Sequence, residues 1–504
     1  MHTRTFGLLS LLLAGCGLSA PTSVEDSSPP PDASPAADAQ PSQEPTAEER
    51  ATFELFLADV KSELTASHTP GASVAIVLHG KLAFAAGVGT KGGTSQESVT
   101  TSTRFRAASL SKMVLAATAM TLVDEGKLDL HAPITKYLPW FVLWNGFDAS
   151  SITMHHLLSH TSGFPCDTLA ICGGGLLSGP SKTFAQSVPQ PLWAKPGDVW
   201  NYSNMGYAIA SLVVASAAGL PEDDFAKAVQ ARIFDRASMT NATYDAKVAE
   251  AADFATGNQL NDTYATTSMW KPASFDCPLW SAPAGISATA TDFAHFAELL
   301  IAKGGDVVRS SSVDLMRAPQ ASVPWVDTQA YGYGLMSYDY PYGAAHPFVF
   351  HTGSQRGFLS ELMMVPSMGF AVVVLANARG PRDVPGKLGA TAIKRFISET
   401  QVWPGKPSAP TLEEHVGVYV DLAGNLGTVT LKIEAPDGGP KVLVASAPEA
   451  TDALGNARPI QGTMTQGYGD GWVFPGGVVA TFYRDGAGRV NRIVTREGIA
   501  TRTP

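Results

Sequence analysis

Residues 109–123, which read SLSKMVLAATAMTLV, form the most informative segment of the chain. Alanine and larger apolar residues occur on nearly every side of a helix drawn through this segment, which predicts a buried helix that ends at Gly126. Ser109 and Lys112 stand three residues apart at its start, so both side chains point from one face into one pocket. A serine is a weak nucleophile until a neighbouring base takes its proton, and a desolvated lysine can be neutral enough to help. The segment therefore predicts nucleophilic chemistry at the start of a core helix.

Two downstream motifs are placed where they could complete such a site. Tyr202-Ser203-Asn204 comes directly before a second apolar helix, predicted at about residues 205–218, and His351-Thr352-Gly353 comes before a pair of strands. Each residue type has an ordinary structural role when it is taken alone: Ser109 as a helix cap, Lys112 as a solvated lysine, Tyr202 as a core tyrosine. The occurrence of all of them together, in this order, favours a shared catalytic site.

With HLLSHTSG at residues 156–163 and Pro196-Gly197, these motifs resemble the serine β-lactamase and penicillin-binding-protein-like hydrolase family, in its class C branch, over about residues 50–400. The resemblance implies a mixed α/β fold, with a mainly antiparallel sheet flanked by helices, a helical lobe, and the site in the cleft. It also implies an acyl-enzyme intermediate. The implied roles are nucleophile for Ser109, helix lysine for Lys112, the tyrosine and amide of the second motif for Tyr202 and Asn204, the third motif for His351, Thr352 and Gly353, and backbone oxyanion donors for Ser109 and Ser354.

A tyrosine hydroxyl is rarely ionised at neutral pH, so Tyr202 needs the positive charge of Lys112 to act as a base, and the two would work as one unit. A glycine at position 353 lets the strand edge approach the substrate. His351 stands where class C enzymes have the lysine of Lys-Thr-Gly, and an imidazole is largely neutral at pH 7. We therefore expect anionic lactams to be held poorly, unless Arg356 supplies the missing charge.

Other motifs have simpler interpretations. A second Ser-x-x-Lys, at residues 268–271, is followed by Pro272 and has no helical pattern, so we interpret it as a chance match. His156 and His160 have metal-ligand spacing, yet no Glu lies between them and no third ligand is evident, which favours a structural role at a helix end. The glycines at 173–175 lack the Lys-Ser/Thr of a phosphate loop. We therefore predict no metal and no cofactor.

The first 45 residues indicate export. Arg4, an apolar run at 6–13 and the sequence Leu-Ala-Gly-Cys ending at Cys16 resemble a bacterial lipoprotein signal, in which the cysteine carries acyl chains. Residues 1–16 are therefore predicted to be the signal peptide and anchor cysteine. Residues 17–45, dominated by Pro, Ala, Ser, Asp and Gln, are predicted to be a disordered tether. The expected location is the cell envelope, with the protein lipid-anchored in the outer membrane or facing the periplasm.

Three cysteines remain after the anchor is excluded. Cys166 and Cys172 are close in sequence, and an exported protein meets an oxidising compartment, so a small loop disulfide between them is our first choice. Cys277 is an alternative partner, because the sequence alone leaves the pairing open.

The domain boundaries are predicted from helix caps, turn residues and short apolar runs. A capping box at residues 46–49 predicts where folded structure begins, and residues 46–404 are assigned to the hydrolase domain. Short β-rich runs separated by turn residues predict a separate C-terminal all-β, barrel-like domain at 411–504.

The composition and net charge argue against a nucleic-acid-binding function. The chain has 504 residues, 45% of them hydrophobic, and a net charge of -10, which is unsuited to gathering nucleic-acid phosphates. The predicted function is a serine hydrolase that cleaves an ester, amide or lactam through an acyl-enzyme on Ser109. Its partners are a small-molecule or peptide substrate and the membrane, through the lipid anchor. Two alternatives stay open: a D-Ala-D-Ala carboxypeptidase or D-aminopeptidase that acts on peptidoglycan fragments, and a non-catalytic, surface-tethered binding lipoprotein. The oligomeric state and the acyl donor are not set by the sequence.

Overall fold

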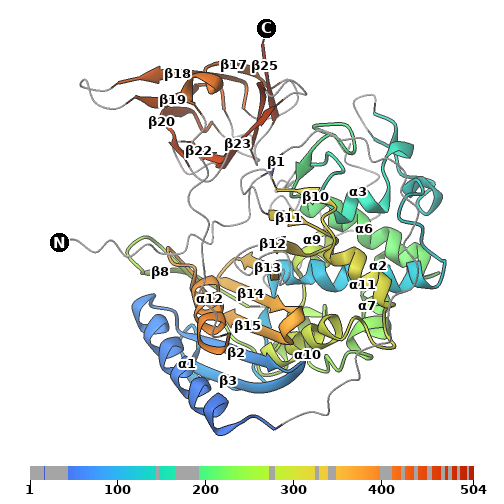
Figure 1. Ribbon diagram of the computed structural model, residues 1–504, viewed down its shortest axis with the longest axis vertical. Coiled ribbons are helices and arrows are strands. Elements are labelled where there is room, and N and C mark those ends of the chain that lie inside the picture. The colour runs from blue at the N-terminus through green and yellow to red at the C-terminus, as the bar shows by residue number, and fades with distance from the viewer. Residues whose placement is uncertain are drawn as a thin grey trace.

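A computed structural model describes the backbone of 16–17 and residues 44–143, 147–165, 192–271, 278–323, 329–338, 348–397, 411–421, 426–435, 441–450, 457–466, 471–474, 479–484, 489–495 and 499–503 (Figure 1). The predicted signal residues before Cys16, most of the tether and Cys166, Cys172 and Cys277 lie outside this description.

A nine-stranded sheet forms the centre of the described N-terminal part, and every neighbouring pair in it is antiparallel. Its strands, in spatial order, are β10 (Ala321–Ser322), β11 (Gln329–Tyr331), β12 (Met336–Tyr338), β13 (Phe348–Gln355), β14 (Phe358–Val365), β15 (Phe370–Ala376), β2 (Gly71–Leu78), β3 (Lys81–Gly92) and β4 (Ser95–Ser98). Strand β15, FAVVVLA, is buried at every residue because both faces of the sheet are covered. The predicted mixed α/β class is confirmed.

Helices cover the two faces of this sheet. Helices α1 (Ala47–Ala66) and α12 (Val384–Phe396) pack on each other and on one face, and α10 (Ala290–Ile301) packs on the other (Figure 1). Alternate residues of β2 and β15 accordingly enter two different hydrophobic clusters. Thr46 forms the expected capping box with Glu49 at the start of α1. Asp383 caps the start of α12 by accepting from the Gly386 N–H over 3.2 Å.

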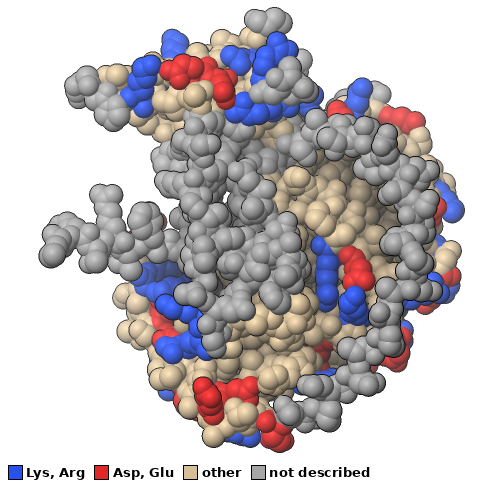
Figure 2. Space-filling view, in the orientation of Figure 1, with Lys and Arg blue, Asp and Glu red and all other residues tan. Residues whose placement is uncertain are grey.

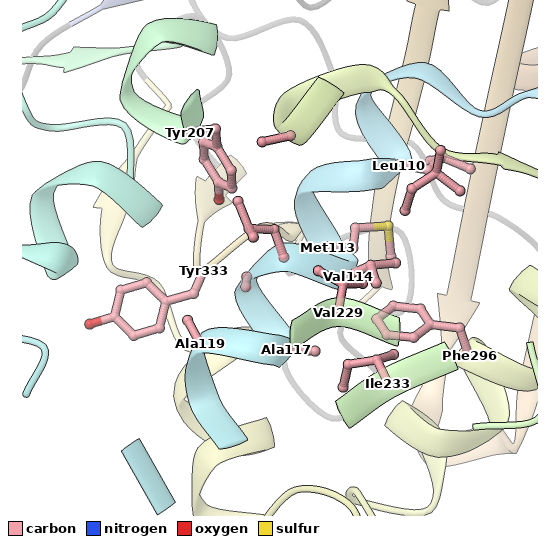
Figure 3. Packing of buried hydrophobic residues seen from close by; sticks show 14 of the residues in the cluster. Leu110, Met113, Val114, Ala117, Ala119, Tyr207, Val229, Ile233, Phe296 and Tyr333 are labelled. Carbon is pink, nitrogen blue, oxygen red and sulfur yellow. The ribbon is translucent and has the colours of Figure 1, made fainter. Parts of the chain in front are cut away.

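The predicted buried helix is α2 (Ser111–Asp124), preceded by a 3-10 turn, η1 (Ala108–Leu110). All of its residues from 111 to 122 are buried. Figure 3 shows Met113, Val114 and Ala117 of this helix meeting Val229, Ile233 and Phe296 from neighbouring helices. The helices that pack on α2 are α6 (Asn204–Ala217), α7 (Phe225–Val229), the π-helix η5 (Gln230–Phe234), α9 (Pro278–Ala284) and α11 (Ser310–Arg317), and α3 (Met154–Leu158) packs on α6.

Short elements complete this part of the chain. They are β1 (Cys16–Gly17), β5 (Phe105–Arg106), η2 (Ile134–Lys136), η3 (Ala149–Ser151), β6 (Trp200–Asn201), η4 (Glu222–Asp224), α8 (Ala246–Glu250), β7 (Gly257–Leu260), β8 (Thr266–Trp270), β9 (Ser287–Ala288), η7 (Pro366–Met368) and β16 (Ala378–Arg379). The second Ser-x-x-Lys begins within strand β8, away from any helix start. No single helix in the described ranges is long and apolar enough to cross a membrane, although the bent pair Asn204–Ala217 and Glu222–Phe234 meets that test together.

The C-terminal part is a second nine-stranded sheet that curls into a half-barrel. Its strands, in spatial order, are β20 (Ile460–Thr463), β19 (Val442–Ala447), β18 (Thr428–Glu434), β17 (Gly417–Val420), β25 (Ile499–Arg502), β24 (Val490–Thr495), β23 (Val479–Arg484), β22 (Gly471–Val473) and β21 (Thr465–Gln466), with η8 (Leu412–His415) at the entry. Tyr419, Trp472 and Phe482 belong to a core of its own. This agrees with the barrel-like all-β character expected after residue 411.

Acidic and basic side chains are interspersed on the face shown in Figure 2, with large uncharged areas between them. The residues coloured in that view form no continuous field of one sign that would attract a polyanion.

Candidate active site

The turn that carries Ser109 is fixed by hydrogen bonds from three sides. The Ala107 N–H donates to the Ile286 carbonyl over 2.9 Å, and the Ala107 carbonyl accepts from Oγ of Ser360 on β14 over 2.7 Å. Ser111 Oγ donates to the Ala108 carbonyl over 2.7 Å. Ala108 itself has a φ of 48°, a conformation that non-glycine residues rarely adopt and that is frequent at functional sites. The fold therefore holds Ser109, which is half-buried, at a strained bend immediately before α2.

Lys112 lies one helical turn into the protein from Ser109 and is completely buried. Its Nζ contacts Oγ of Ser109 at 3.0 Å, Oδ1 of Asn204 at 2.6 Å and the Pro283 carbonyl at 3.1 Å. The carbonyl can only accept a hydrogen bond, and so can the amide oxygen. The serine hydroxyl can either accept or donate.

This set of partners suits both protonation states of Lys112. An ammonium group donates to all three oxygens. A neutral amine donates to Asn204 and Pro283 and keeps its lone pair for the hydroxyl proton of Ser109. A proton can therefore pass from Ser109 to Lys112 without any rearrangement of the other two hydrogen bonds, which is the arrangement an activated serine requires.

The second motif lies between β6 and α6. Ser203 caps α6, because its Oγ accepts from the Gly206 N–H over 2.9 Å, and this places Asn204 at the first position of the helix, beside Lys112. The Tyr202 ring is buried, with its centroid 4.8 Å from Nζ of Lys112. Tyr207, one turn along α6, has its ring centroid 5.6 Å from the same Nζ. The lysine is therefore enclosed by aromatic rings as well as by hydrogen-bond acceptors.

His351 lies on β13 and is completely buried. Its Nδ1 lies 2.6 Å from the Thr352 carbonyl, so Nδ1 carries the proton, and Nε2 accepts from the Tyr331 hydroxyl at 3.1 Å. Burial, together with the charge of Lys112 when that residue is protonated, lowers the pKa of His351 to about 3. The ring is therefore neutral at physiological pH, and both of its nitrogens are used within the protein. Its centroid lies 6.2 Å from that of Tyr202.

The rest of the third motif lies against the serine turn. A Cβ on Gly353 would meet the Ala107 carbonyl oxygen at 2.5 Å and Oγ of Ser360 at 2.1 Å, so only glycine fits this approach. Within the described residues, β12 pairs with β13 only at Phe348–Phe350, so the edge that continues through Thr352 to Ser354 has no strand beside it. Thr352 and Ser354 are partly exposed there, and Gly353 is buried.

Arg356 is exposed on the turn between β13 and β14, and its guanidinium lies 4.7 Å from the ring centroid of Trp270 on β8. This stacking holds the cation on the β7–β8 hairpin.

The two histidines with metal-ligand spacing have different surroundings. Nδ1 of His156 forms part of the cap of α3 with Thr153, whereas His160 contacts Tyr202 at a ring-centroid distance of 4.3 Å. Among the described side chains, no group of three or more His, Cys, Asp or Glu is arranged to hold a metal ion.

Several residues of the site gave no sequence signal. The Pro283 carbonyl can be contributed by any residue type, and Tyr331 and Tyr207 look like ordinary core tyrosines. The Tyr331 hydroxyl donates a hydrogen bond to His351, and burial raises the pKa of Tyr331 well above the ordinary value for tyrosine. Only their positions after folding bring these residues to the site.

A buried Ser-x-x-Lys helix start, a Tyr-x-Asn turn and an open strand edge with a glycine together define the class of the serine β-lactamases and penicillin-binding proteins. The family model described as Beta-lactamase matches residues 56–394, and the chain belongs to this family.

Curated relatives are moderately similar. Protein flp of Staphylococcus aureus (strain COL) is 24% identical over 323 residues, and penicillin-binding protein 4 of Amycolatopsis lactamdurans is 28% identical over 330 residues. The matches cover 63% and 62% of this chain, and 61% and 82% of the respective relatives. The chain therefore spans less than two thirds of the length of protein flp.

Solved structures share the fold. The octameric penicillin-binding protein homologue from Pyrococcus abyssi superposes with a TM-score of 0.60 at 21% identity, covering 89% of this chain and 100% of that one. The crystal structure of SurE with D-Leu superposes with a TM-score of 0.65 at 20% identity, covering 90% and 100%.

Proposed function

We propose that this protein is a serine hydrolase that forms an acyl-enzyme on Ser109. The observation that carries the proposal is the 3.0 Å contact between Nζ of the fully buried Lys112 and Oγ of Ser109. The hydrogen bonds to Asn204 and Pro283 would hold the Lys112 side chain in place without Ser109. The additional contact with Ser109 is explained if Lys112 accepts the proton of the serine hydroxyl.

The proposed reaction uses the residues as follows. Lys112 takes the proton of the Ser109 hydroxyl while Oγ bonds to the carbonyl carbon of the substrate, and the carbonyl oxygen becomes an oxyanion. Backbone N–H groups of Ser109 and Ser354 stabilise this charge. The intermediate collapses when the bond to the leaving group breaks and the proton passes to that group. Water then repeats the sequence on the acyl-enzyme and releases the acid.

Tyr202 belongs to the same proton-transfer unit. Its ring lies beside Nζ, so a positive charge that forms on Lys112 is stabilised by the ring face. In this proposal, Lys112 and Tyr202 act as one unit, and Nζ of Lys112 contacts Oγ of Ser109 directly.

The proposed substrates are neutral esters or small amides. A buried, neutral His351 provides no cation for a substrate carboxylate, and the guanidinium of Arg356 is stacked on Trp270. Anionic lactams should therefore be poor substrates.

A D-Ala-D-Ala carboxypeptidase or D-aminopeptidase is the second candidate. It is favoured by the similarity to penicillin-binding protein 4 and by the strand edge beyond Phe350, which suits a peptide backbone. The competing idea of a non-catalytic binding lipoprotein is disfavoured, because binding alone gives no reason to keep Lys112 buried against Ser109.

We also propose that the protein acts in the cell envelope, held by acyl chains on Cys16. This rests on the lipoprotein-like signal and the polar segment that follows it.

Labelling with a fluorophosphonate probe tests the enzymatic proposal. Wild-type protein should be labelled and should hydrolyse members of a panel of short p-nitrophenyl esters, D-amino acid amides, D-Ala-D-Ala peptides and a chromogenic cephalosporin. Ser109→Ala should lose both properties at an unchanged melting temperature. Ser211→Ala is the matched control, since Ser211 is buried on α6 and donates to the Ala208 carbonyl over 2.6 Å. Labelling that persists in Ser109→Ala would show that another residue is the nucleophile.

A further inference from the structure

His160 lies directly behind the Tyr202-Ser203-Asn204 turn and is completely buried. Its backbone carbonyl accepts from the Asn201 N–H over 2.6 Å, and its Nδ1 accepts from the Ser203 N–H over 3.0 Å. The residue itself has a φ of 62°, which is unusual for a side chain of this size. A residue with a strained backbone therefore holds the chain at two points, Asn201 and Ser203, on either side of Tyr202.

The imidazole also fixes the aromatic groups of the site. Its centroid lies 4.3 Å from that of Tyr202, 4.9 Å from Tyr207 and 4.6 Å from Tyr331. Tyr331 in turn bonds His351, so one ring contacts both the tyrosine of the second motif and the support of the third.

The hydrogen bond to Ser203 determines the tautomer of His160. A backbone N–H can only donate, so Nδ1 must be unprotonated and the ring proton must be on Nε2. Nε2 is buried and has no hydrogen-bond partner among the described residues. Burial, together with the charge of Lys112 when that residue is protonated, keeps the pKa of His160 well below its usual range, so the ring stays neutral.

We propose that His160 is a positioning residue for catalysis: its Nδ1 holds the backbone between Tyr202 and Asn204, so that both side chains keep their places around Lys112. This proposal rests on the proposed function. His160 then has more than a structural role at a helix end, because its Nδ1 accepts from Ser203, the residue between Tyr202 and Asn204.

An ordinary core histidine would explain the burial and the ring contacts, but not this aim. Packing requires a ring of the right size, whereas positioning requires an acceptor at the δ position. The two requirements can be separated by substitution.

His160→Asn and His160→Gln form a matched pair. Both variants lose the ring and keep an amide, but only asparagine places its oxygen where Nδ1 stands. Asparagine also tolerates the positive φ. We expect kcat/KM for an ester substrate to be about tenfold or more higher in His160→Asn than in His160→Gln, with the difference in kcat rather than KM, because a buried Ser203 N–H left unpaired shifts the turn and not the substrate-binding edge.

Equal kcat/KM in two folded variants would overturn the proposal, as would activities that simply follow their melting temperatures. A measurement on the wild-type protein does not depend on the variants folding: the ¹⁵N shifts of His160 should show an unprotonated Nδ1 and a protonated Nε2 between pH 5 and 8. The opposite tautomer or a doubly protonated ring would also overturn it. If fluorophosphonate does not label the wild-type protein, the proposed function fails instead. That outcome is separate from a failure of the His160 proposal, because the labelling experiment uses no His160 variant.

Discussion

Replacing Asn204 with alanine removes a short hydrogen bond to Nζ of Lys112, the 2.6 Å contact with Oδ1. If Lys112 is a neutral amine before the reaction, this bond becomes charge-assisted only when the Ser109 proton arrives. The loss then falls on the transition state rather than on the resting enzyme. A hydrogen bond to a charged group contributes about 1.5–3 kcal/mol. At about 1.4 kcal/mol per factor of ten, kcat/KM should fall about 10- to 150-fold.

The assay compares ester hydrolysis and the fluorophosphonate labelling rate in wild type, Asn204→Ala and Asn204→Asp, alongside their melting temperatures. The aspartate has the same shape but favours the ammonium form of Lys112 before reaction, so it should also lower kcat/KM. An alanine variant within threefold of wild-type kcat/KM would refute the reasoning. A large fall in melting temperature with unchanged kcat/KM would mean that the lysine is already charged in the resting enzyme and cannot be the base.

Three further predictions concern other parts of the molecule. We expect kcat/KM for a short p-nitrophenyl ester to exceed that for a chromogenic cephalosporin, and His351→Lys to narrow the gap; efficient cephalosporin turnover by the wild type would contradict this. Burial and the neighbouring Asp383 raise the pKa of Glu361 well above 4.5, so the folded state retains a proton that the unfolded state releases, and stability falls as pH rises above the unfolded value. Glu361→Gln should therefore raise the melting temperature at pH 8 and have little effect at pH 4; equal shifts at both pH values would argue against the buried carboxyl pair. Cys16→Ser should leave unprocessed precursor or release soluble protein from the envelope fraction, whereas mass spectrometry of an unmodified N-terminus elsewhere in the wild type would rule out the anchor.

The sequence was informative wherever a signal is local. The helix at residues 109–123 could be predicted because its apolar residues occur on every side, and the strand at 370–376 because an unbroken apolar run of that length suits a sheet covered on both faces. The Thr46 cap and the strands after residue 411 were likewise visible from short-range patterns. Ser109 and Lys112 could be paired from their spacing alone, since one turn of helix places them together.

The long-range part of the site was decided by tertiary structure. Lys112 bonds a carbonyl 171 positions further along the chain, at Pro283, and a backbone carbonyl has no sequence signature. The sequence placed His351 in the third motif, but only folding directs its nitrogens to Thr352 and Tyr331.

His160 shows the same division most clearly. The sequence predicted that His160 lies at the end of a helix. Its hydrogen bond to Ser203 forms only when folding brings together two residues that are 43 positions apart. Local periodicity and capping are properties of neighbouring residues, so the sequence by itself determined the elements and the serine–lysine pair. Hydrogen bonds between distant segments and the neutral state of buried histidines depend on packing and desolvation, and these exist only once the chain has folded.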